Sequence, residues 1–298
     1  MRNSKTPLRL AAVLASAALA VSACGGDDGG DTNGDGGGDD TAAEGGDDGG
    51  DTNGGSLTIG IKYDQPGLGL MEGDTPSGMG VDVGVAVAEG LGYSEDDITW
   101  QEAPTPQRET LLDTGQVDMI VATYSITDER FQTVDFAGPY FVAGQDLLIR
   151  ADDDSIQGPA DLEGKLLCSV TGSTSAANVQ EEYPDVQLQE YSTYSECLSG
   201  VVNGSLDALT TDDVILAGYA AQPEYEGQLQ LTGNTFSEEN FGVGLPKGNE
   251  QCEEINDILN GMWEDGTMEQ IIADNLGDSY QYNQELNPPE PSAEYCSA

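Results

Sequence analysis

The chain has 298 residues, and its 55 Asp and Glu against nine Lys and Arg, with no His, give a formal net charge of −46 at pH 7. Nucleic acids and anionic lipid surfaces attract clusters of positive charge, so an acidic chain of this kind is not expected to bind either one. The lack of His removes the usual base of a Ser or Cys triad and a common ligand of catalytic metals, and we expect no metal and no cofactor.

Residues 1–23 are predicted to be a signal peptide. They contain three of the nine cations, followed by an uncharged run from Leu10 to Val21 that is too short to span a bilayer. The run ends in Val-Ser-Ala-Cys, which resembles a bacterial lipobox, with Cys24 as the lipidated first residue of the mature chain. An ordinary cleavage site with an incidental Cys is the alternative. We favour the lipobox because a flexible tether follows directly.

That tether is residues 24–55, predicted to be a disordered linker rich in Gly and Asp. The decapeptide GGDDGGDTNG occurs in it twice, at 25–34 and 45–54. Such a segment buries no core and its charges repel one another. Its aspartates do not follow the ligand spacing of a calcium-binding EF-hand loop, so a solvated spacer is the favoured interpretation.

From Ser56 onward, strand-like and helix-like segments alternate, which is typical of βα units and a largely parallel sheet. In chain order we expect a strand at 57–61, a helix at 81–88, a strand at 98–101, a helix at 107–113, a buried strand at 117–122, an extended stretch at 140–150, a strand at 166–170, a helix at 174–182, a strand at 186–191, a helix at 194–202, a strand at 207–211, a helix at 214–221, an extended stretch at 240–246 and helices at 252–263 and 268–275.

These elements form two sets of similar size, which predicts an α/β protein with two lobes. Extended segments near 147–152 and 236–243 join the sets, so the chain is expected to cross between lobes twice. The predicted first lobe is 56–147 with 242–298, and the second is 148–241. A ligand is then expected in the cleft between them.

Four cysteines remain once Cys24 is set aside, and an even number in an exported protein suggests two disulfides. Three connectivities exist. We favour Cys168 with Cys197, which close a local loop, and Cys252 with Cys296. A zinc site is the weaker interpretation, because the chain has no His and the spacing does not fit one.

Two arginines, Arg108 and Arg130, lie in a stretch rich in hydroxyl residues, in a chain with few other cations. The predicted strand 117–122 leads to Thr123 and Ser125 and then to a helix start near Arg130. Free N–H groups and hydroxyls meet anions at such a position, and an arginine can clamp a carboxylate with two hydrogen bonds. The alternative, weighed equally on the residues alone, is a surface Arg130 paired with Asp128 or Asp135.

The second set of elements repeats this pattern. Ser173 and Thr174 follow a strand and a glycine at a helix start, where they offer N–H groups to an anion or simply cap the helix. Asp212 and Asp213 follow the strand at 207–211, where a carboxylate could hold an ammonium group. Capping the next helix is again the alternative.

Five segments together resemble family 3 of the bacterial solute-binding proteins, the extracytoplasmic receptors of polar amino-acid ABC importers. They are IGIKYDQPGLG, QRETLLDTGQVDMIVATYSITDER, VDFAGPYFVAGQDLLIR, CSVTGSTSA and TTDDVILAGY, and they occur in the family's order. The similarity is greatest to the glutamate-binding lipoproteins of actinobacteria. It implies a periplasmic-binding-protein-like fold of type II, with two lobes, each a mostly parallel sheet flanked by helices, and two hinge crossovers.

The resemblance also implies ligand-binding roles. The family's clamp for the α-carboxylate falls on Arg130, aided by Thr123, Ser125, Ser173 and Thr174, and its ammonium acceptor falls on Asp212.

In relatives that bind acidic amino acids, basic residues at the positions of Arg108 and near Lys62 face the side-chain carboxylate. Tyr63, Gln65 and Tyr124 are candidates either for the pocket wall or for ordinary packing.

This assignment predicts glutamate, or aspartate, as the ligand, because glutamine would leave Arg108 opposite a neutral amide. The expected partners are an ABC permease and its ATPase, and the membrane is contacted through a lipid anchor only. We expect a monomer at the extracellular face of the cytoplasmic membrane. A sensor domain for a receptor kinase, and a dehydratase or lyase using a pair such as Asp212 and Glu102, are the alternatives. We do not expect an enzyme.

Overall fold

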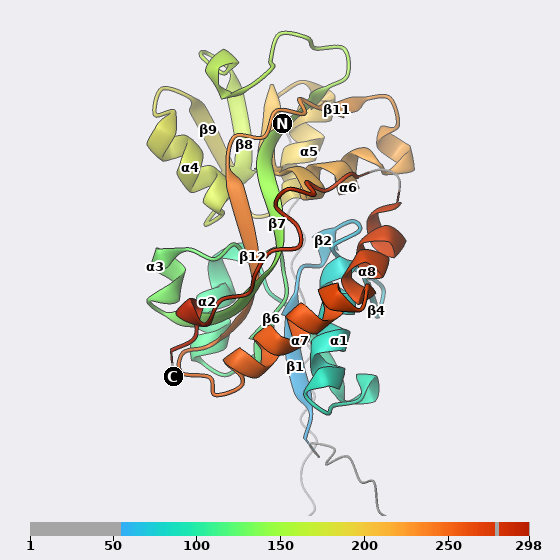
Figure 1. Cartoon of the computed structure of the whole chain (residues 1–298). Coiled ribbons are helices and arrows are strands. Elements are labelled where there is room, and N and C mark those ends of the chain that lie inside the picture. Colours follow the sequence, from blue (N-terminus) through green and yellow to red (C-terminus); the bar gives the residue numbers. More distant parts are fainter. Residues whose placement is uncertain (1–54, 278–279, 298) are drawn as a thin grey trace, which may run out of the picture. The chain divides into compact units, whose positions relative to one another are not determined.

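Two long antiparallel strands, β7 (Val134–Arg150) and β12 (Glu238–Pro246), lie side by side in this computed structural model, and the other elements flank them (Figure 1). The structure describes residues 55–277 and 280–297. The signal peptide, Cys24 and all but the last residue of the predicted linker lie outside the described residues.

The remaining elements alternate along the chain much as the sequence predicts. The strands are β1 (Leu57–Ile61), β2 (Asp64–Gln65), β3 (Gly69–Glu72), β4 (Thr75–Ser77), β5 (Ile98–Glu102), β6 (Met119–Ile120), β8 (Leu166–Val170), β9 (Gln187–Tyr191), β10 (Ala208–Asp212) and β11 (Leu229–Leu231). The α-helices are α1 (Met79–Gly90), α2 (Arg108–Asp113), α3 (Asp128–Phe131), α4 (Thr174–Glu182), α5 (Tyr194–Asn203), α6 (Asp213–Ala220), α7 (Cys252–Glu264) and α8 (Thr267–Leu276).

One hydrogen-bonded path of strands runs through both lobes, in the order β5-β1-β6-β12-β7-β10-β8-β9, with β11 also paired to β7. In the first lobe β1 is parallel to β5 and β6, and in the second lobe β8 is parallel to β9 and β10. The two central strands are antiparallel to their neighbours. Each lobe therefore has a mostly parallel sheet, as expected from the βα pattern.

Strand β7 passes from one lobe to the other. Up to Gly144 it pairs with β12, and from Gln145 onward it pairs with β10 and then also with β11. Both segments between the lobes are thus strands within the sheet and not loose loops. A short separate sheet, order β2-β3-β4, follows β1 and was not predicted.

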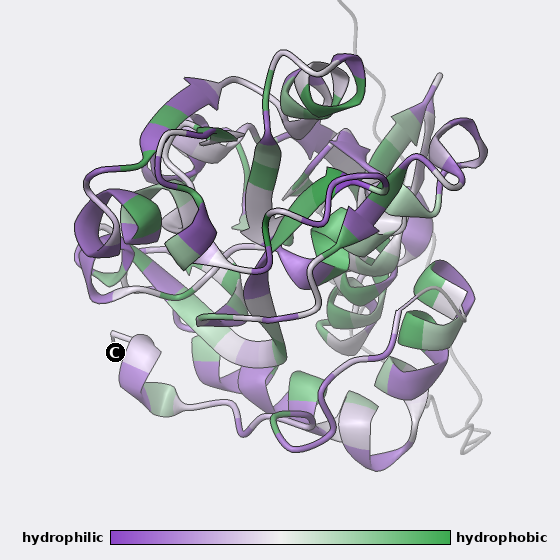
Figure 2. Ribbon diagram, turned by 90° about the horizontal axis from the view of Figure 1, so that it is seen from above, coloured by the Kyte–Doolittle hydropathy of each residue, from purple (hydrophilic) through white to green (hydrophobic). Residues whose placement is uncertain are grey.

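Apolar side chains on the sheets and the inner faces of the helices form the core. In the first lobe, Ile59 of β1 lies under α1, which buries Val83 and Val87. Gly84 of α1 faces the ring of Trp100, and a Cβ there would lie 3.3 Å from it, so the missing side chain permits close packing. Figure 2 shows green, hydrophobic residues gathered on the strands and inner helix faces, with purple, hydrophilic residues on the outer turns.

Both predicted disulfides are confirmed. Cys168 on β8 joins Cys197 on α5, with their Cα atoms 5.6 Å apart. Cys252 at the start of α7 joins Cys296 near the C-terminus, with their Cα atoms 5.7 Å apart. The first bond ties a helix to its sheet inside the second lobe, and the second fastens the C-terminal segment to the first lobe.

The C-terminal segment lies along the central strands, in red in Figure 1. Asn287 binds Val142 of β7 with both side-chain atoms: its Oδ1 accepts from the Val142 N–H and its Nδ2 donates to the Val142 carbonyl, each at 2.9 Å. Further along, the Ser292 N–H donates to the carbonyl of Gly138. In the part of the chain that the structure describes, no helix combines the length and apolarity needed to cross a bilayer.

The predicted buried strand at 117–122 is shorter than expected. Only Met119 and Ile120 are strand residues, although the N–H of Asp118 and that of Val121 also donate to carbonyls of β1. Three residues after the strand, Thr123 adopts a φ of 48°, in the left-handed region, where the chain bends.

Candidate ligand-binding site

A small cavity is enclosed between the two lobes, at the ends of β6, β8 and β10. Both lobes line it, and its wall includes most of the residues proposed from the sequence. The lining residues are Gln65, Thr105, Arg108, Thr123, Ser125, Arg130, Ser173, Thr174, Tyr194, Asp212 and Ile215.

Arg130 extends across the cleft and does not lie on the surface. Its Nη1 donates to the carbonyl of Ser125 in the first lobe at 2.7 Å, and its Nη2 donates to the carbonyl of Gly172 in the second at 3.0 Å. The nearest acid is Glu109, 3.6 Å from Nε. Neither Asp128 nor Asp135 is within ion-pair distance of Arg130 in the described residues, so the surface-pair interpretation is wrong.

The helix that carries Arg130 begins as the sequence predicts. Thr127 is the N-cap of α3, and its side chain accepts a hydrogen bond from the Arg130 N–H. The same short turn therefore fixes the start of the helix and the direction of the arginine.

Arg108 is buried at the start of α2, with 2% of its surface exposed. Its Nε has no hydrogen-bond partner, and within the described residues no carboxylate is within ion-pair distance of it. Burial is the main reason its pKa is lowered, with the neighbouring charge of Arg130 second. The guanidinium instead lies 5.0 Å from the ring centroid of Tyr124, as does that of Arg130.

Lys62 lies in an adjoining cavity that shares Gln65 and Thr123 with the first. It is 2% exposed, and its Nζ is 3.1 Å from Asp64. Burial lowers its pKa, Asp64 opposes that shift, and the charge of Arg108 lowers the pKa further. The structure thus brings Lys62 near Arg108 but does not place it in the wall of the same cavity.

Asp212 presents a buried carboxylate to the cavity from the end of β10. It is 4% exposed, and among the described residues its side chain makes one long hydrogen bond, 3.4 Å from the hydroxyl of Ser175. Although Asp212 is the N-cap residue of α6, its side chain makes no capping bond. Burial, and then the charge of Glu239, raise its pKa well above the usual range. The next residue, Asp213, binds the backbone of Gly144 and Val214 and serves a structural role.

The hydroxyl residues differ in how their side chains are used. Ser173 caps α4 by accepting a bond from the Ala176 N–H at 3.0 Å, so the capping interpretation holds for it. Thr123 donates to the carbonyl of Ala122 at 2.7 Å. Ser125 and Thr174 lie 3.4 Å apart across the cleft, one from each lobe.

Glu239, at the interlobe end of β12, escaped the sequence reasoning. It is 3% exposed and accepts a hydrogen bond of 2.7 Å from each of the hydroxyls of Ser125 and Thr174. The chain has 55 acidic residues, and Glu239 stands beside another one, Glu238. No local sequence pattern distinguishes it from the others. Gln65, a packing or pocket candidate, does line the cavity, and its Nε2 is buried without a partner.

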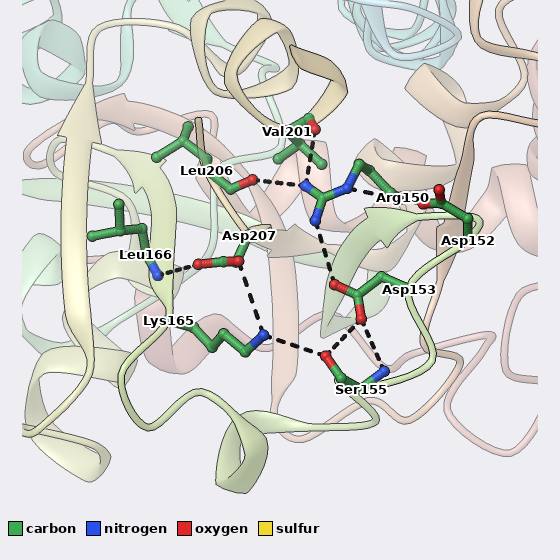
Figure 3. Close-up of polar contacts among 9 residues, drawn as sticks. All are labelled: Arg150, Asp152, Asp153, Ser155, Lys165, Leu166, Val201, Leu206 and Asp207. Carbon is green, nitrogen blue, oxygen red and sulfur yellow. Dashed lines mark hydrogen bonds and ion pairs between the residues drawn. The ribbon is translucent and has the colours of Figure 1, made fainter. Parts of the chain in front are cut away.

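The other described cations lie away from the cleft and are bound to acids or carbonyls. Figure 3 shows Arg150 donating to the carbonyls of Val201 and Leu206 and facing Asp152 and Asp153. Lys165, in the same view, faces Ser155 and Asp207.

Lys247 pairs with Asp135 at 3.0 Å and lies 3.5 Å from the ring centroid of Phe131. Among the cations that the structure describes, Arg108 in the cleft is the one with a buried nitrogen that lacks a hydrogen-bond partner.

Two α/β lobes enclosing a polar, charged cavity are the arrangement of a solute-binding receptor. The chain belongs to the bacterial extracellular solute-binding proteins, family 3, whose model matches residues 57–278. This confirms the family predicted from the sequence, and with it the two-lobed fold class and the solute-binding function.

Named relatives support the same assignment. The chain is 43% identical to the glutamate-binding protein GluB of Corynebacterium efficiens, over 98% of this chain and 99% of that protein. It is 34% identical to the ABC transporter glutamine-binding protein GlnH of Bacillus subtilis, over 72% of this chain and 79% of that protein. Among solved structures, an ancestral arginine-binding protein bound to glutamine is similar, with 31% identity and a TM-score of 0.69 over 75% of this chain and 99% of that one.

Proposed function

We propose that this protein is the glutamate receptor of an ABC amino-acid importer, binding its ligand in the interlobe cavity. The observation that carries the proposal is the charge of the cavity: Arg130 and Arg108 in its wall, Lys62 beside it, and Asp212 opposite. Glutamate has two carboxylates and one ammonium group, which match Arg130, Arg108 and Asp212 of the cavity wall in number and sign. Lys62 is already paired with Asp64.

Arg108 supports glutamate over glutamine. A buried guanidinium without a carboxylate partner is costly, and an anionic ligand group would supply the missing charge. A neutral amide would not. The relatives differ on this point, since GluB is named for glutamate and GlnH for glutamine. Arg108 is therefore the residue on which our choice of ligand depends.

Arg130 and Asp212 are proposed to hold the groups that all amino acids share. Arg130 is already fixed by two carbonyls, one in each lobe, so its remaining N–H groups are oriented without further loss of side-chain freedom. Asp212 has a carboxylate that needs a cation, because it is buried and lacks a strong partner. Ser125, Thr123, Thr174 and the loop at Ser173 complete the proposed ligand contacts.

Transport would follow by hinge closure and delivery. In our proposal the lobes, 56–147 with 242–298 and 148–241, close about the ligand by bending β7 and β12, and the closed receptor docks on a permease driven by an ATPase. The receptor is held as a monomer at the extracellular face of the cytoplasmic membrane by a lipid on Cys24. It releases the ligand chemically unchanged.

The direct test is calorimetric titration of the ligand-free domain, residues 56–298, with Glu, Asp, Gln and Asn. We expect Glu to bind most tightly, Asp next and the two amides weakest. Tighter binding of Gln than of Glu would refute the charge argument. Mass spectrometry of the recovered ligand tests the absence of chemical turnover, and a dehydrated or deaminated product would contradict it.

A further inference from the structure

Glu239 holds the two lobes together through hydroxyl groups that line the cavity. Its Oε2 accepts from the Ser125 hydroxyl of the first lobe and from the Thr174 hydroxyl of the second, both at 2.7 Å. Its Oε1 accepts from Asn178 of α4 at 3.2 Å and from Ser237, just before β12, at 2.9 Å. One buried carboxylate thus receives four hydrogen bonds and spans the cleft.

The carboxylate lies behind the cavity wall. Ser125 and Thr174 are in the lining, whereas Glu239 is not. Glu239 is also positioned where the lobes meet, since its Cα pairs with that of Ala143 on β7, two residues before β7 changes its partner from β12 to β10. It therefore does not compete for the ligand's place but supports the groups around it.

The direction of the hydroxyl hydrogens follows from this arrangement. A Ser or Thr hydroxyl has one hydrogen, and an ionised carboxylate can only accept. The hydrogens of Ser125 and Thr174 consequently point to Glu239, and their lone pairs are left for the cavity. Lone pairs that face the cavity, which Asp212 also lines, suit an ammonium group and not a carboxylate. In this proposal Ser125 and Thr174 therefore serve the ammonium group, and not the α-carboxylate as the family resemblance implies.

We propose that Glu239 is a positioning residue that latches the closed state: it joins Ser125 and Thr174 across the cleft and turns their lone pairs toward the ligand. The inference rests on the proposed function, because it concerns how the same site retains glutamate. Its consequence is kinetic. A bond between lobes that forms on closure slows the opening that releases the ligand, while the encounter with ligand is unaffected.

The carboxylate cannot be replaced by an amide without loss. Gln145 is fixed because its Nε2 donates to the carbonyl of Ser175 at 3.0 Å, so its Oε1 must accept from Asn178. Asn178 Nδ2 is therefore a donor toward position 239. An amide there can place its NH₂ against Asn178, and that hydrogen bond is lost. It can instead donate from its NH₂ to the two hydroxyls, which then turn their hydrogens toward the cavity and no longer offer it their lone pairs.

The test compares Glu239→Gln with Glu238→Gln, which removes the same charge from the adjacent, exposed residue of β12. Calorimetry gives the affinity for glutamate, and a chase of bound radiolabelled glutamate gives the dissociation rate. We expect Glu239→Gln to raise the dissociation rate about tenfold and to change the association rate by less than about twofold. Glu238→Gln should leave both rates unchanged.

A double-mutant cycle with Thr174→Val tests the contact itself and stays informative if Glu239→Gln alone lowers stability. The two substitutions together should raise the dissociation rate by less than the product of their separate effects. Three results would each overturn the latch. The dissociation rate of Glu239→Gln could equal that of the wild type, or Glu238→Gln could raise the rate as much as Glu239→Gln does. In the cycle, the rate increase of the double variant could equal the product of the two single increases. If the unsubstituted protein does not bind glutamate, the proposed function fails together with the latch. If the unsubstituted protein binds glutamate and Glu239→Gln has the same rates, the latch alone is refuted.

Discussion

Two arginines, Arg108 in the cleft and Arg150 outside it, are used in opposite ways. Arg108 is buried, and its Nε has no hydrogen-bond partner. Arg150 has 27% of its side chain exposed, and it donates to two carbonyls and faces two aspartates. Lys165 and Lys247 are likewise partly exposed and paired with Asp207 and Asp135.

The difference in partners gives the two kinds of cation different roles, one in stability and the other in ligand binding. A cation at the periphery that has its partners stabilises the fold modestly, whereas a buried cation that lacks them lowers the stability of the ligand-free protein. The cleft therefore holds charge at a cost that a bound anion would offset. Substitutions of Arg108 and Arg150 should consequently have opposite effects on stability and unequal effects on binding.

The largest effect is expected for Arg130→Ala. It removes the proposed clamp for the α-carboxylate together with two hydrogen bonds, of which the one to Gly172 connects the lobes. We expect the affinity to fall about a thousandfold for every amino acid that binds, since truncating a buried charged partner costs several kcal/mol. Calorimetric titration with Glu and Gln measures it. Loss for one ligand only would contradict a role in recognising the common group.

Asp212→Asn should lower the affinity for glutamate about a hundredfold, because the ammonium group loses its counter-charge. Its effect on stability should have the opposite sign. The folded-state pKa of Asp212 is raised, so the stability it contributes is present below its unfolded pKa of about 4 and is lost as the pH rises through the folded value.

The ligand-free Asn variant should accordingly unfold at higher urea concentration than the wild type at pH 7, and its stability should depend less on pH above pH 4. Urea titrations at a series of pH values measure both quantities. A variant that is less stable than the wild type at pH 7 would show that the Asp212 carboxylate is not strained in the empty cleft.

Arg108→Met should change selectivity most clearly. We expect the affinity for glutamate to fall about thirtyfold and that for glutamine to change little, because only glutamate loses a charge partner. The ligand-free protein should become more stable by about 1–3 kcal/mol, since Met fills the space without a buried charge. Equal losses for both ligands would mean that Arg108 does not face the ligand side chain.

Arg150→Met is the matched substitution outside the cleft and has the smallest expected effect on binding. The loss of hydrogen bonds to Val201 and Leu206 should destabilise the protein by about 1–2 kcal/mol. The affinity for glutamate should stay within about twofold. A large loss of affinity here would remove the distinction between the two groups of cations.

Sequence patterns predicted most of the fold because they record local physical requirements. Period-two and helical spacing located β1, α1, α4 and α5. A capping box, in which Thr193 and Glu196 bond to each other's backbone N–H, fixes the start of α5. The long strand β7 was underestimated, since its first residues, from Val134, include glycine and proline and become a strand only by pairing with β12. The positions of the lobe boundaries remain predictions.

The sequence by itself determined the family and the short set of cations from which a site could be built, and it favoured the two disulfide pairs that the structure contains. A scarce residue type is informative by its rarity, and Arg108 and Arg130 are prominent for that reason. Only the tertiary structure decided which charges lie in the cleft and which of them are left without partners. It also revealed Glu239, because a common acidic residue gains a role only through neighbours that are distant in the chain, at positions 125 and 174.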